Sequence, residues 1–394
     1  MVSLLATVLC LAVAPLATAY PKAEAVEARC GNIPSNYQPP SITTLPDPFT
    51  FINGDRVKSK RDFRCRQKEI AALFARFELG DKPAADSVKG SFANNILTVT
   101  VTNNKKSIAF NATITYPEKG KAPYPAIITL GYPNIPKLDG VAFINFPNDQ
   151  IAGQIGASYR GQGLFYELYG KNASAGSLTA WAWGVSRLID ALEETRGTKI
   201  NVEFIGVTGC SRNGKGAFVV GALDDRIGLT IPQESGTGGS GCWRVADATK
   251  AAGTNIQTAA QIITENTWLS QRFDPWTTKV SSLPIDHHLL AGLVAPRGLL
   301  VIDNDIDWLG PTSTAVCMGV GQLVYKALGE TDAFGYSDVG AHNHCLFPDS
   351  QKPQLEAFVK KWLFDKEVDT DGVFVTSRNI TLTDWYKWKV PRLY

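Results

Sequence analysis

The chain has 394 residues and a formal net charge of +2 at pH 7, from 39 basic and 37 acidic residues with no long basic run. The near balance of charges predicts no basic patch that could bind nucleic acid or an anionic membrane, so neither is an expected partner. Only 19% of the residues are charged, whereas 35 are Gly and 9 are Trp, which is typical of a large core surrounded by long ordered loops.

The start of the chain has the pattern of a secreted protein. Residues 1–19 form an apolar run that ends in the small-x-small sequence Ala-Thr-Ala, which predicts a signal peptide over 1–19. No later stretch reaches the roughly 18 apolar residues that are needed to span a bilayer. Sequons for glycosylation at Asn111, Asn172 and Asn379 agree with this route. We therefore expect a soluble extracellular protein in which 20–394 form a single domain.

Apolar segments along this domain alternate between strand and helix patterns. The Pro-rich stretch 33–51 is expected to be an extended arm, and 96–104 and 107–117 have the alternation of a β-hairpin with an Asn-Asn-Lys-Lys turn. Further strands are predicted over 124–134, 202–209, 226–235 and 297–305. Helices are predicted over 177–197, 215–225 and 352–366, and a long polar excursion separates the last two strands. This order predicts a three-layer α/β/α sandwich with a mainly parallel central sheet.

The stretch IGVTGCSRNGKGAF, residues 205–218, joins a predicted strand to a predicted helix through a small polar turn. Ser211 stands at the corner, as in the nucleophile elbow of α/β-hydrolases, where the turn lifts the hydroxyl out of the sheet and the helix N-terminus faces an oxyanion. The usual G-x-S-x-G is altered, because Gly214 is displaced by one position. The alternatives are a glycine-rich turn with a surface serine and a phosphate-binding loop, but Gly216 follows Lys215 where a phosphate-binding loop requires Ser or Thr. Ser211 is therefore the candidate nucleophile.

A serine nucleophile needs a base, and the chain contains only four histidines, at 287, 288, 342 and 344. In hydrolases of this type the histidine lies between the last core strand and the closing helix, a position that GYSDVGAHNHCLFP occupies here. This stretch offers His342 and His344. A metal site built on the H-x-H pair is the alternative, but a third ligand motif is not evident, so no metal is expected.

The cysteines distinguish the two histidines. If His344 reaches Ser211 across about 3 Å, the neighbouring Cys210 and Cys345 approach each other closely enough for a disulfide, whose Cα atoms lie roughly 4.4 to 6.8 Å apart. This clamp between the two loops favours His344 over His342. Removal of Cys10 with the signal peptide leaves six of the seven cysteines, and an even number in an oxidising compartment predicts three disulfides in all. The pairs that we favour for the others, without excluding the two alternative pairings, are Cys30–Cys65 and Cys242–Cys317.

Two loops offer the acid that would orient the histidine. Asp303, Asp305 and Asp307 follow the strand that precedes the histidine loop, which is the common position of the acid. Glu234 ends the strand that follows the nucleophile's helix, where an acid meets the histidine in some variants of the fold. The usual chain order slightly favours the aspartates.

The motifs VTGCSRNGKGA, IPQESGTGG, CWR and HNHC resemble those of the fungal glucuronoyl esterases, and the resemblance extends over essentially the whole chain after residue 19. It implies an α/β-hydrolase fold and a Ser-His-Glu triad formed by Ser211, His344 and Glu234, in place of the aspartates. It also implies cleavage of the ester between 4-O-methyl-glucuronic acid of glucuronoxylan and lignin alcohols through a glucuronoyl-enzyme, without a cofactor. Another carbohydrate esterase, acting on acetyl or feruloyl xylan, and a non-catalytic carbohydrate-binding protein are the alternatives.

The same resemblance assigns roles around the triad. It places Arg212 beside the oxyanion, Trp308 along the sugar, and three polar side chains at the sugar hydroxyls, namely Lys215, Gln257 and Glu265. Their chemistry is suitable, because Lys donates, Glu accepts, Gln does both and an indole offers a flat apolar wall. Without the resemblance, Lys215, Gln257 and Glu265 could equally be solvated and Trp308 could belong to the core. The expected partners are glucuronoxylan and lignin–carbohydrate esters, and we expect a monomer.

Overall fold

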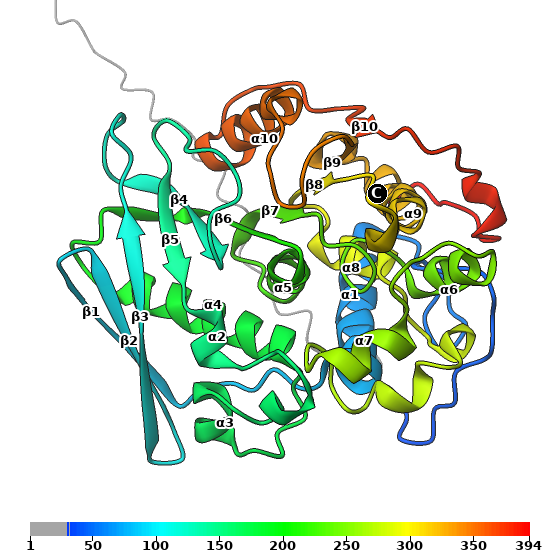
Figure 1. Ribbon diagram of the computed structural model, residues 1–394, viewed down its shortest axis with the longest axis horizontal. Coiled ribbons are helices and arrows are strands. Elements are labelled where there is room, and N and C mark those ends of the chain that lie inside the picture. The colour runs from blue at the N-terminus through cyan, green and yellow to red at the C-terminus, as the bar shows by residue number, and fades with distance from the viewer. Residues whose placement is uncertain (1–29, 31) are drawn as a thin grey trace, which may run out of the picture.

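The computed structural model describes residue 30 and residues 32–394, so the predicted signal peptide over 1–19 lies outside the described residues. The described part is built around a ten-stranded sheet in the order β1-β2-β3-β5-β4-β6-β7-β8-β9-β10, which Figure 1 shows crossing the molecule from the β1 edge to the β10 edge. A search of the described residues finds no helix with the length and apolarity required to cross a membrane.

The first part of the sheet is antiparallel. The predicted hairpin is confirmed as β2 and β3, and its turn places Asn104 and Lys105 at φ +48° and +64°, as a two-residue hairpin loop requires. A helix and the edge strand β1 precede the hairpin in the chain. The strands of this part are β1 (Ser87–Ala93), β2 (Ile96–Asn103), β3 (Lys106–Thr115) and β5 (Ala142–Phe146), which pairs antiparallel with β3.

From β5 to β10 every neighbouring pair is parallel. These strands are β4 (Tyr124–Leu130), β6 (Ile200–Cys210), β7 (Ile227–Gln233), β8 (Gly298–Asp303), β9 (Phe334–Asp338) and β10 (Phe374–Val375). Their carboxyl ends meet at one edge of the sheet, which is where ligands bind in open α/β folds.

Helices cover both faces of the sheet, which confirms the three-layer architecture (Figure 1). Helix α10 (Lys352–Phe364) packs on one face, where Phe358 and its neighbours bury the apolar side chains of β7 and β8. The opposite face carries α4 (Ser177–Glu194), α5 (Arg212–Leu223), α8 (His288–Val294) and α9 (Pro311–Leu328). Trp181 and Trp183 of α4 are fully buried in this larger core.

The connections contain the remaining helices. They are α1 (Lys60–Phe74), followed directly by a π-helical turn (Ala75–Leu79), then α2 (Asn148–Ile151), α3 (Leu164–Tyr169), α6 (Trp243–Ala251) and α7 (Ala259–Glu265). Short 3₁₀ turns occupy Ala157–Tyr159, Asp274–Trp276, Val280–Ser282, Asp307–Leu309, Thr331–Ala333, Asp349–Gln351 and Leu382–Asp384.

The segment between β7 and β8 is a polar excursion only in its middle, because most of 247–282 is half-buried or exposed whereas both ends are buried. Residues 235–246 and 283–295 are buried, and α8 is buried along its whole length. The polar groups are satisfied internally, because Arg244 donates to Asp286 and to the main-chain oxygen of Leu283. This segment is therefore an ordered insertion packed against the carboxyl edge of the sheet.

The Pro-rich stretch 33–51 has no helix or strand of its own and lies along the body of the protein. Leu45 and Phe49 are buried in the main core. The Leu45 N–H donates to the main-chain oxygen of Trp385 at 2.7 Å, and the Ile42 N–H donates to that of Ser281 at 2.8 Å. The stretch thus connects the C-terminal tail with the insertion.

Candidate active site

Ser211 lies on a sharp turn between β6, which ends at Cys210, and α5, which begins at Arg212. Its backbone φ of +59° is in a region that residues other than glycine rarely adopt. Its N–H donates to the main-chain oxygen of Gln233 at 2.9 Å. The turn also needs glycines. A Cβ at Gly214 would lie 2.5 Å from that same Gln233 oxygen, so a larger residue could not occupy the position.

The Ser211 side chain is half-buried, and its hydroxyl makes no hydrogen bond within the described part of the chain. The start of α5 lies directly behind it, where the first N–H groups of a helix have no partner inside the helix. Such N–H groups and the helix dipole favour negative charge at this position. The geometry therefore suits a serine whose reaction generates an oxyanion.

Glu234 follows β7 directly and is completely buried. Its Oε2 accepts hydrogen bonds from His344 Nδ1 at 2.8 Å, from the Cys345 N–H at 2.9 Å and from Asn304 Nδ2 at 3.2 Å. Burial opposes the charge, but the bonds from His344 and Cys345 outweigh it and hold the pKa of Glu234 below its ordinary value. The carboxylate is therefore charged and orients the His344 ring.

The two histidines of the HNHC motif have different surroundings. The His344 side chain is 28% exposed, and its Nε2 makes no hydrogen bond among the described residues. His342 is 7% exposed, and its two ring nitrogens contact the main-chain oxygens of Val339 at 2.7 Å and Asn343 at 3.1 Å. Of the two, only His344 has a free nitrogen. Ser211 and His344 do not form a direct hydrogen bond here, and such bonds are often long until substrate binds.

Three disulfides are present in the pairing expected from the sequence. The Cα atoms are 5.0 Å apart in Cys30–Cys65, 5.8 Å in Cys210–Cys345 and 5.3 Å in Cys242–Cys317. The second of these bonds joins the residue before Ser211 to the residue after His344. Ligand atoms of Cys210, His344 and Cys345 lie within 4.8 Å of one another, but disulfide sulfurs are not the thiolates that bind metals.

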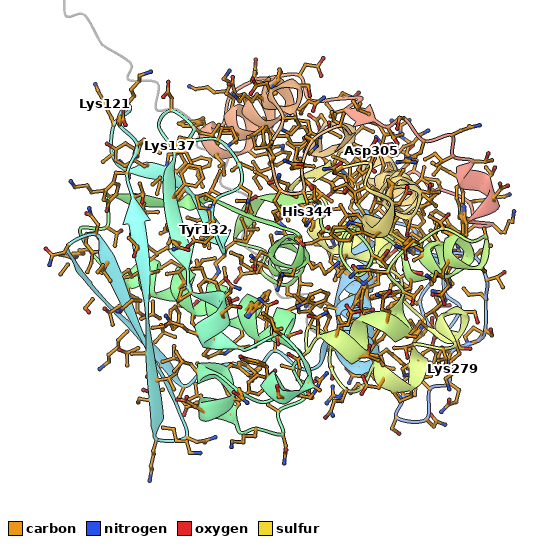
Figure 2. The ribbon with its side chains drawn as sticks, in the orientation of Figure 1. Lys121, Tyr132, Lys137, Lys279, Asp305 and His344 are labelled. Carbon is orange, nitrogen blue, oxygen red and sulfur yellow. A yellow bond between two sulfur atoms is a disulfide. The ribbon has the colours of Figure 1, made fainter. Side chains whose placement is uncertain are left out.

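The three aspartates that compete with Glu234 in the sequence are placed differently. Within the described chain none of them hydrogen-bonds to His344. Burial raises the pKa of Asp303 to about 7, and this side chain faces Ser240 at 3.4 Å. Asp305 is exposed, and Figure 2 shows it on the side of β9, away from His344. Asp307 is also exposed, at the start of a 3₁₀ turn.

Lys215 is only 3% exposed, which excludes a solvated side chain. Its Nζ donates to the main-chain oxygen of Ser235 and, at 2.6 Å, to that of Thr237, and it lies 5.3 Å from the centre of the Trp268 ring. Burial lowers the pKa of Lys215 to about 7. Two of the three ammonium N–H groups are thus used by the protein, which leaves one for a ligand.

Four other candidates lie on loops and helix ends around this group. Trp308 is 37% exposed, so it is not a core residue, and its ring packs edge-on against His344 at 5.0 Å. Its main-chain oxygen accepts the Gln257 N–H at 3.3 Å. Glu265 is exposed at the end of α7, and Arg212 is half-buried at the first position of α5.

Exposed apolar side chains border the site. Tyr132, two residues after β4, is 86% exposed, and Leu346, next to Cys345, is 57% exposed. Asn134, on the same loop as Tyr132, donates through Nδ2 to the Cys345 main-chain oxygen at 3.4 Å, which brings this loop beside the His344 loop. Tyr132, Leu346 and Trp308 are the exposed large apolar side chains on the loop that carries His344 and on the loops that contact it.

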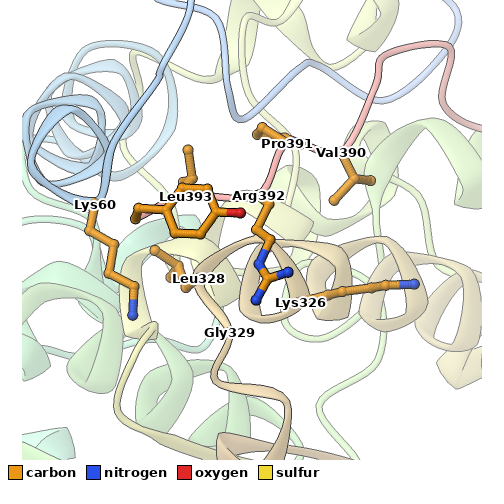
Figure 3. A pocket seen from close by; sticks show the side chains of 9 residues that line it. Lys60, Lys326, Leu328, Gly329, Val390, Pro391, Arg392 and Leu393 are labelled. Carbon is orange, nitrogen blue, oxygen red and sulfur yellow. The ribbon is translucent and has the colours of Figure 1, made fainter.

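A separate pocket of about 890 Å³ lies at the C-terminal end of α9 (Figure 3). Helix α9 has 18 residues, and at 1.5 Å per residue it is about 27 Å long. Its other end follows the Trp308 loop, so the pocket is remote from Ser211. It is lined by Lys60, Lys326, Leu328, Gly329, Val390, Pro391, Arg392, Leu393 and Tyr394. Lys60 is paired with Glu330 at 3.1 Å.

Comparison with known proteins identifies the family. Residues 99–329 match the family model described as glucuronyl esterase, fungi. A 4-O-methyl-glucuronoyl methylesterase of Neurospora crassa is 49% identical over 387 residues, which covers 98% of this chain and 98% of that protein. The chain belongs to the fungal glucuronoyl esterase family. It is a carboxylic ester hydrolase.

Solved glucuronoyl esterases have the same fold. The catalytic domain of the Hypocrea jecorina enzyme superposes with a TM-score of 0.91 at 51% identity, covering 92% of this chain and 100% of that chain. A serine-to-alanine mutant of the Sporotrichum thermophile enzyme, in complex with methyl 4-O-methyl-beta-D-glucopyranuronate, gives 0.90 at 50% identity, covering 92% and 99%. The α/β-hydrolase architecture expected from the elbow is therefore confirmed.

The disulfide beside the site leads to a prediction for this glucuronoyl esterase. Replacing both Cys210 and Cys345 by Ala should lower activity as well as thermal stability, because the bond closes a separation of 135 residues and also holds the Ser211 and His344 loops together. Loss of a native disulfide typically costs about 2 to 5 kcal/mol. Calorimetry and ester hydrolysis below the unfolding temperature measure the two effects separately.

The control is the double variant Cys242→Ala and Cys317→Ala, whose bond joins the start of α6 to α9. It should lose stability but retain more activity per folded molecule. Equal specific activities of the two folded double variants would show that the Cys210–Cys345 bond has no part in positioning the site.

Proposed function

We propose that this protein is a secreted serine esterase that hydrolyses esters between 4-O-methyl-glucuronic acid of glucuronoxylan and lignin alcohols. The observation that carries the proposal is the 2.8 Å bond between His344 and buried Glu234, on a loop that a disulfide ties to the Ser211 turn. Ser211 is the nucleophile, His344 the base and Glu234 the acid that orients it. The complex of the Sporotrichum thermophile enzyme with a methyl 4-O-methyl-glucuronate supports a uronate ester as the substrate.

The reaction is an acyl transfer in two halves. His344 Nε2 accepts the Ser211 proton while Oγ attacks the uronate carbonyl carbon, and the negative charge develops on the carbonyl oxygen. The Arg212 N–H and guanidinium, with help from the loop that follows β4, stabilise this oxyanion. His344 then donates its proton to the leaving alcohol oxygen, which breaks the ester bond and leaves a glucuronoyl-Ser211 ester.

Water completes the cycle. His344 accepts a proton from the water molecule as its oxygen attacks the acyl carbon, and then returns the proton to Ser211 Oγ as the uronic acid leaves. Throughout, the Glu234 carboxylate stabilises the positive His344 ring through Nδ1. The lowered pKa of Glu234 supports this role, because the carboxylate stays charged in weakly acidic conditions.

The acyl half of the substrate is held by the residues around Lys215. The remaining N–H of the Lys215 ammonium donates to a sugar hydroxyl, Gln257 and Glu265 bind neighbouring hydroxyls, and the half-exposed Trp308 indole covers the sugar face. Two carbonyl partners fix the ammonium before substrate arrives. Such pre-organisation reduces the entropy cost of binding.

Secretion is supported by two observations besides the predicted signal peptide. Disulfides persist in oxidising compartments, and the described chain has three. The asparagines of the three sequons, Asn111, Asn172 and Asn379, are all exposed, as glycosylation requires. Mass determination of the secreted protein before and after deglycosylation tests this part.

One assay series tests the substrate class. The protein should hydrolyse benzyl glucuronate, discriminate against benzyl galacturonate, which differs at one hydroxyl, and leave acetylated xylan intact. Release of acetate from the xylan at a rate comparable with benzyl glucuronate hydrolysis would instead identify an acetyl esterase, with the sugar on the alcohol side.

Substrate hydroxyls provide a finer prediction. A 2-deoxy or 3-deoxy analogue of methyl 4-O-methyl-glucuronate should lose at least about tenfold in kcat/KM, because an unpaired polar group in the site costs about 1 to 3 kcal/mol. Glu265→Ala should lose activity on the parent ester and discriminate less against the analogues. Equal kcat/KM for parent and deoxy esters would mean that Lys215, Gln257 and Glu265 do not read the sugar.

A further inference from the structure

A buried pair of ionisable side chains lies behind the residues that surround Lys215. Glu78 is 0% exposed and belongs to the π-helical turn after α1, and His287 is 1% exposed and directly precedes α8. His287 Nε2 contacts Glu78 Oε1 at 2.7 Å. Glu78 Oε2 accepts the Trp243 indole N–H at 3.1 Å. Single π-helical turns are rare in proteins, and those that occur are often found at functional sites. The turn in this protein places Glu78 against the insertion.

The other nitrogen of His287 holds the insertion itself. Nδ1 lies 2.6 Å from the main-chain oxygen of Gly239. A carbonyl oxygen only accepts, so Nδ1 must carry a proton and donate it. Burial opposes a charged ring, but the Glu78 carboxylate outweighs it and raises the pKa of His287 above its ordinary value. Asp286 acts in the same direction, and its own carboxylate is paired with Arg244.

Gly239 is part of the glycine-rich loop 235–241, which follows Glu234 directly. The loop is closed on itself, since Ser235 Oγ accepts the Ser240 N–H at 2.9 Å and the Gly241 N–H donates to the Gly236 oxygen at 2.9 Å. It is buried throughout. Because the loop is closed by these internal bonds, the His287 bond to Gly239 fixes the position of the whole loop relative to α8 and not only the position of one peptide.

The position of Lys215 depends on this same loop. Both carbonyls that hold its Nζ belong to the loop, at Ser235 and Thr237. The packing is equally close, because a Cβ on Gly239 would lie 3.0 Å from Lys215 Cγ and 2.6 Å from Ser235 Cβ. A shift of the Gly239 peptide would therefore move both the stem and the ammonium of Lys215.

We propose that His287, oriented by Glu78, is a positioning residue for substrate recognition: its Nδ1–H holds the glycine-rich loop 235–241 and thereby fixes the Lys215 ammonium. The inference rests on the proposed sugar-binding role of Lys215. Stability alone does not require such a pair, because buried ion pairs are often replaceable by apolar side chains without loss of stability. A buried pair that fixes one arrangement of a recognition loop serves specificity instead.

The experiment compares Asn and Leu at 287 in a Glu78→Gln background, where no unpaired carboxylate remains. The Asn amide N–H can replace Nδ1–H toward Gly239, and Leu cannot. The Leu variant should raise KM for methyl 4-O-methyl-glucuronate at least about tenfold, the effect expected of a mispositioned charged hydrogen-bond donor. Its kcat should change less than KM. The Asn variant should recover most of the wild-type KM.

His288 provides the matched control. It is as buried as His287 and adjacent to it, but its Nε2 contacts the main-chain oxygen of Pro46 at 2.8 Å and its Nδ1 lies 4.0 Å from Cys242 Sγ, so neither ring nitrogen holds a residue of the loop 235–241. His288→Leu should lower the unfolding temperature and leave KM unchanged. An equal rise of KM in this variant would show that any change in the core near α8 disturbs the site, and would overturn the inference.

Two further measurements keep the test decisive. Gly239→Ala, which places a methyl group against Lys215 and Ser235, should raise KM in the same way, and it tests the link between the loop and Lys215 even where the Leu variant does not fold. Labelling of Ser211 by a small phosphonate that carries no sugar should proceed at wild-type rate in every folded variant. Absence of labelling in the wild type would contradict the serine mechanism, whereas normal labelling with unchanged KM in the Leu and Gly239→Ala variants would overturn the role of His287 alone.

Discussion

Ser211→Ala is expected to reduce kcat for uronate esters by about 10⁶, the loss measured when the serine of a comparable triad is removed. The hydroxyl is the proposed nucleophile, and Ala has no group that could take its place. Stability should change little, because the Ser211 hydroxyl makes no hydrogen bond within the described chain and Ala can keep the same backbone. Burst and steady-state release of an aryl alcohol, together with calorimetry, measure both effects.

The Ala variant should still bind the ester. The Lys215, Gln257 and Trp308 side chains remain, so the dissociation constant for methyl 4-O-methyl-glucuronate should stay close to the wild-type KM wherever acylation is slower than substrate release. Hydrolysis within tenfold of wild type in a preparation free of the native enzyme would remove Ser211 from the mechanism.

The second large effect is expected for Glu234→Gln, which should reduce kcat by up to about 10⁴. Gln carries no charge to stabilise the protonated ring of His344, and its amide can orient the ring in the wrong tautomer. The charged Glu234 carboxylate also contributes to the free energy of unfolding, because its pKa is lower in the folded protein than in the unfolded chain. This stabilisation is fully present at pH values above the unfolded pKa and is lost as the pH falls through the lowered pKa of the folded protein. The variant should lack this acidic limb in its stability profile.

Asp305→Asn is the matched control, because it neutralises a carboxylate that follows the next strand of the sheet. Asp305 is exposed and has no bond to His344, so this variant should retain most activity. If Asp305→Asn were the more impaired of the two, the acid would have to be assigned to the loop after β8.

Local patterns predicted those parts of the fold that have one apolar face or lie wholly in the sheet. The hairpin β2–β3 and the helices α4 and α10 are clear examples. Helix α9 was not predicted, because its surface is buried almost all round and its sequence contains glycines and β-branched residues, so no amphipathic period marks it. Strand β9 was missed for a related reason, since FGYSD is short and every one of its residues is buried.

The site was predicted where covalent or stereochemical limits link distant residues. The short reach of a disulfide was enough to place Cys210 beside Cys345 and to select His344. The acid could not be chosen in this way, because β7 and β8 are neighbours and both end near the histidine loop. The resemblance to the family favoured Glu234, and in the structure its hydrogen bond to His344 Nδ1 distinguishes it from Asp303. The Glu78–His287 pair gave no signal, since its members are far apart in sequence and each fits an ordinary buried segment.

The exposed side chains of Tyr132, Trp308 and Leu346 affect how the enzyme adsorbs to an insoluble substrate. The three side chains are exposed and the His344 side chain is itself 28% exposed, so the alcohol half of an ester at His344 can remain part of a material far larger than the protein. Apolar contacts made by these three side chains also favour adsorption with His344 facing the surface. On insoluble particles, turnover then depends on the accessible surface area and on how densely the enzyme covers it, and less on dissolved substrate concentration.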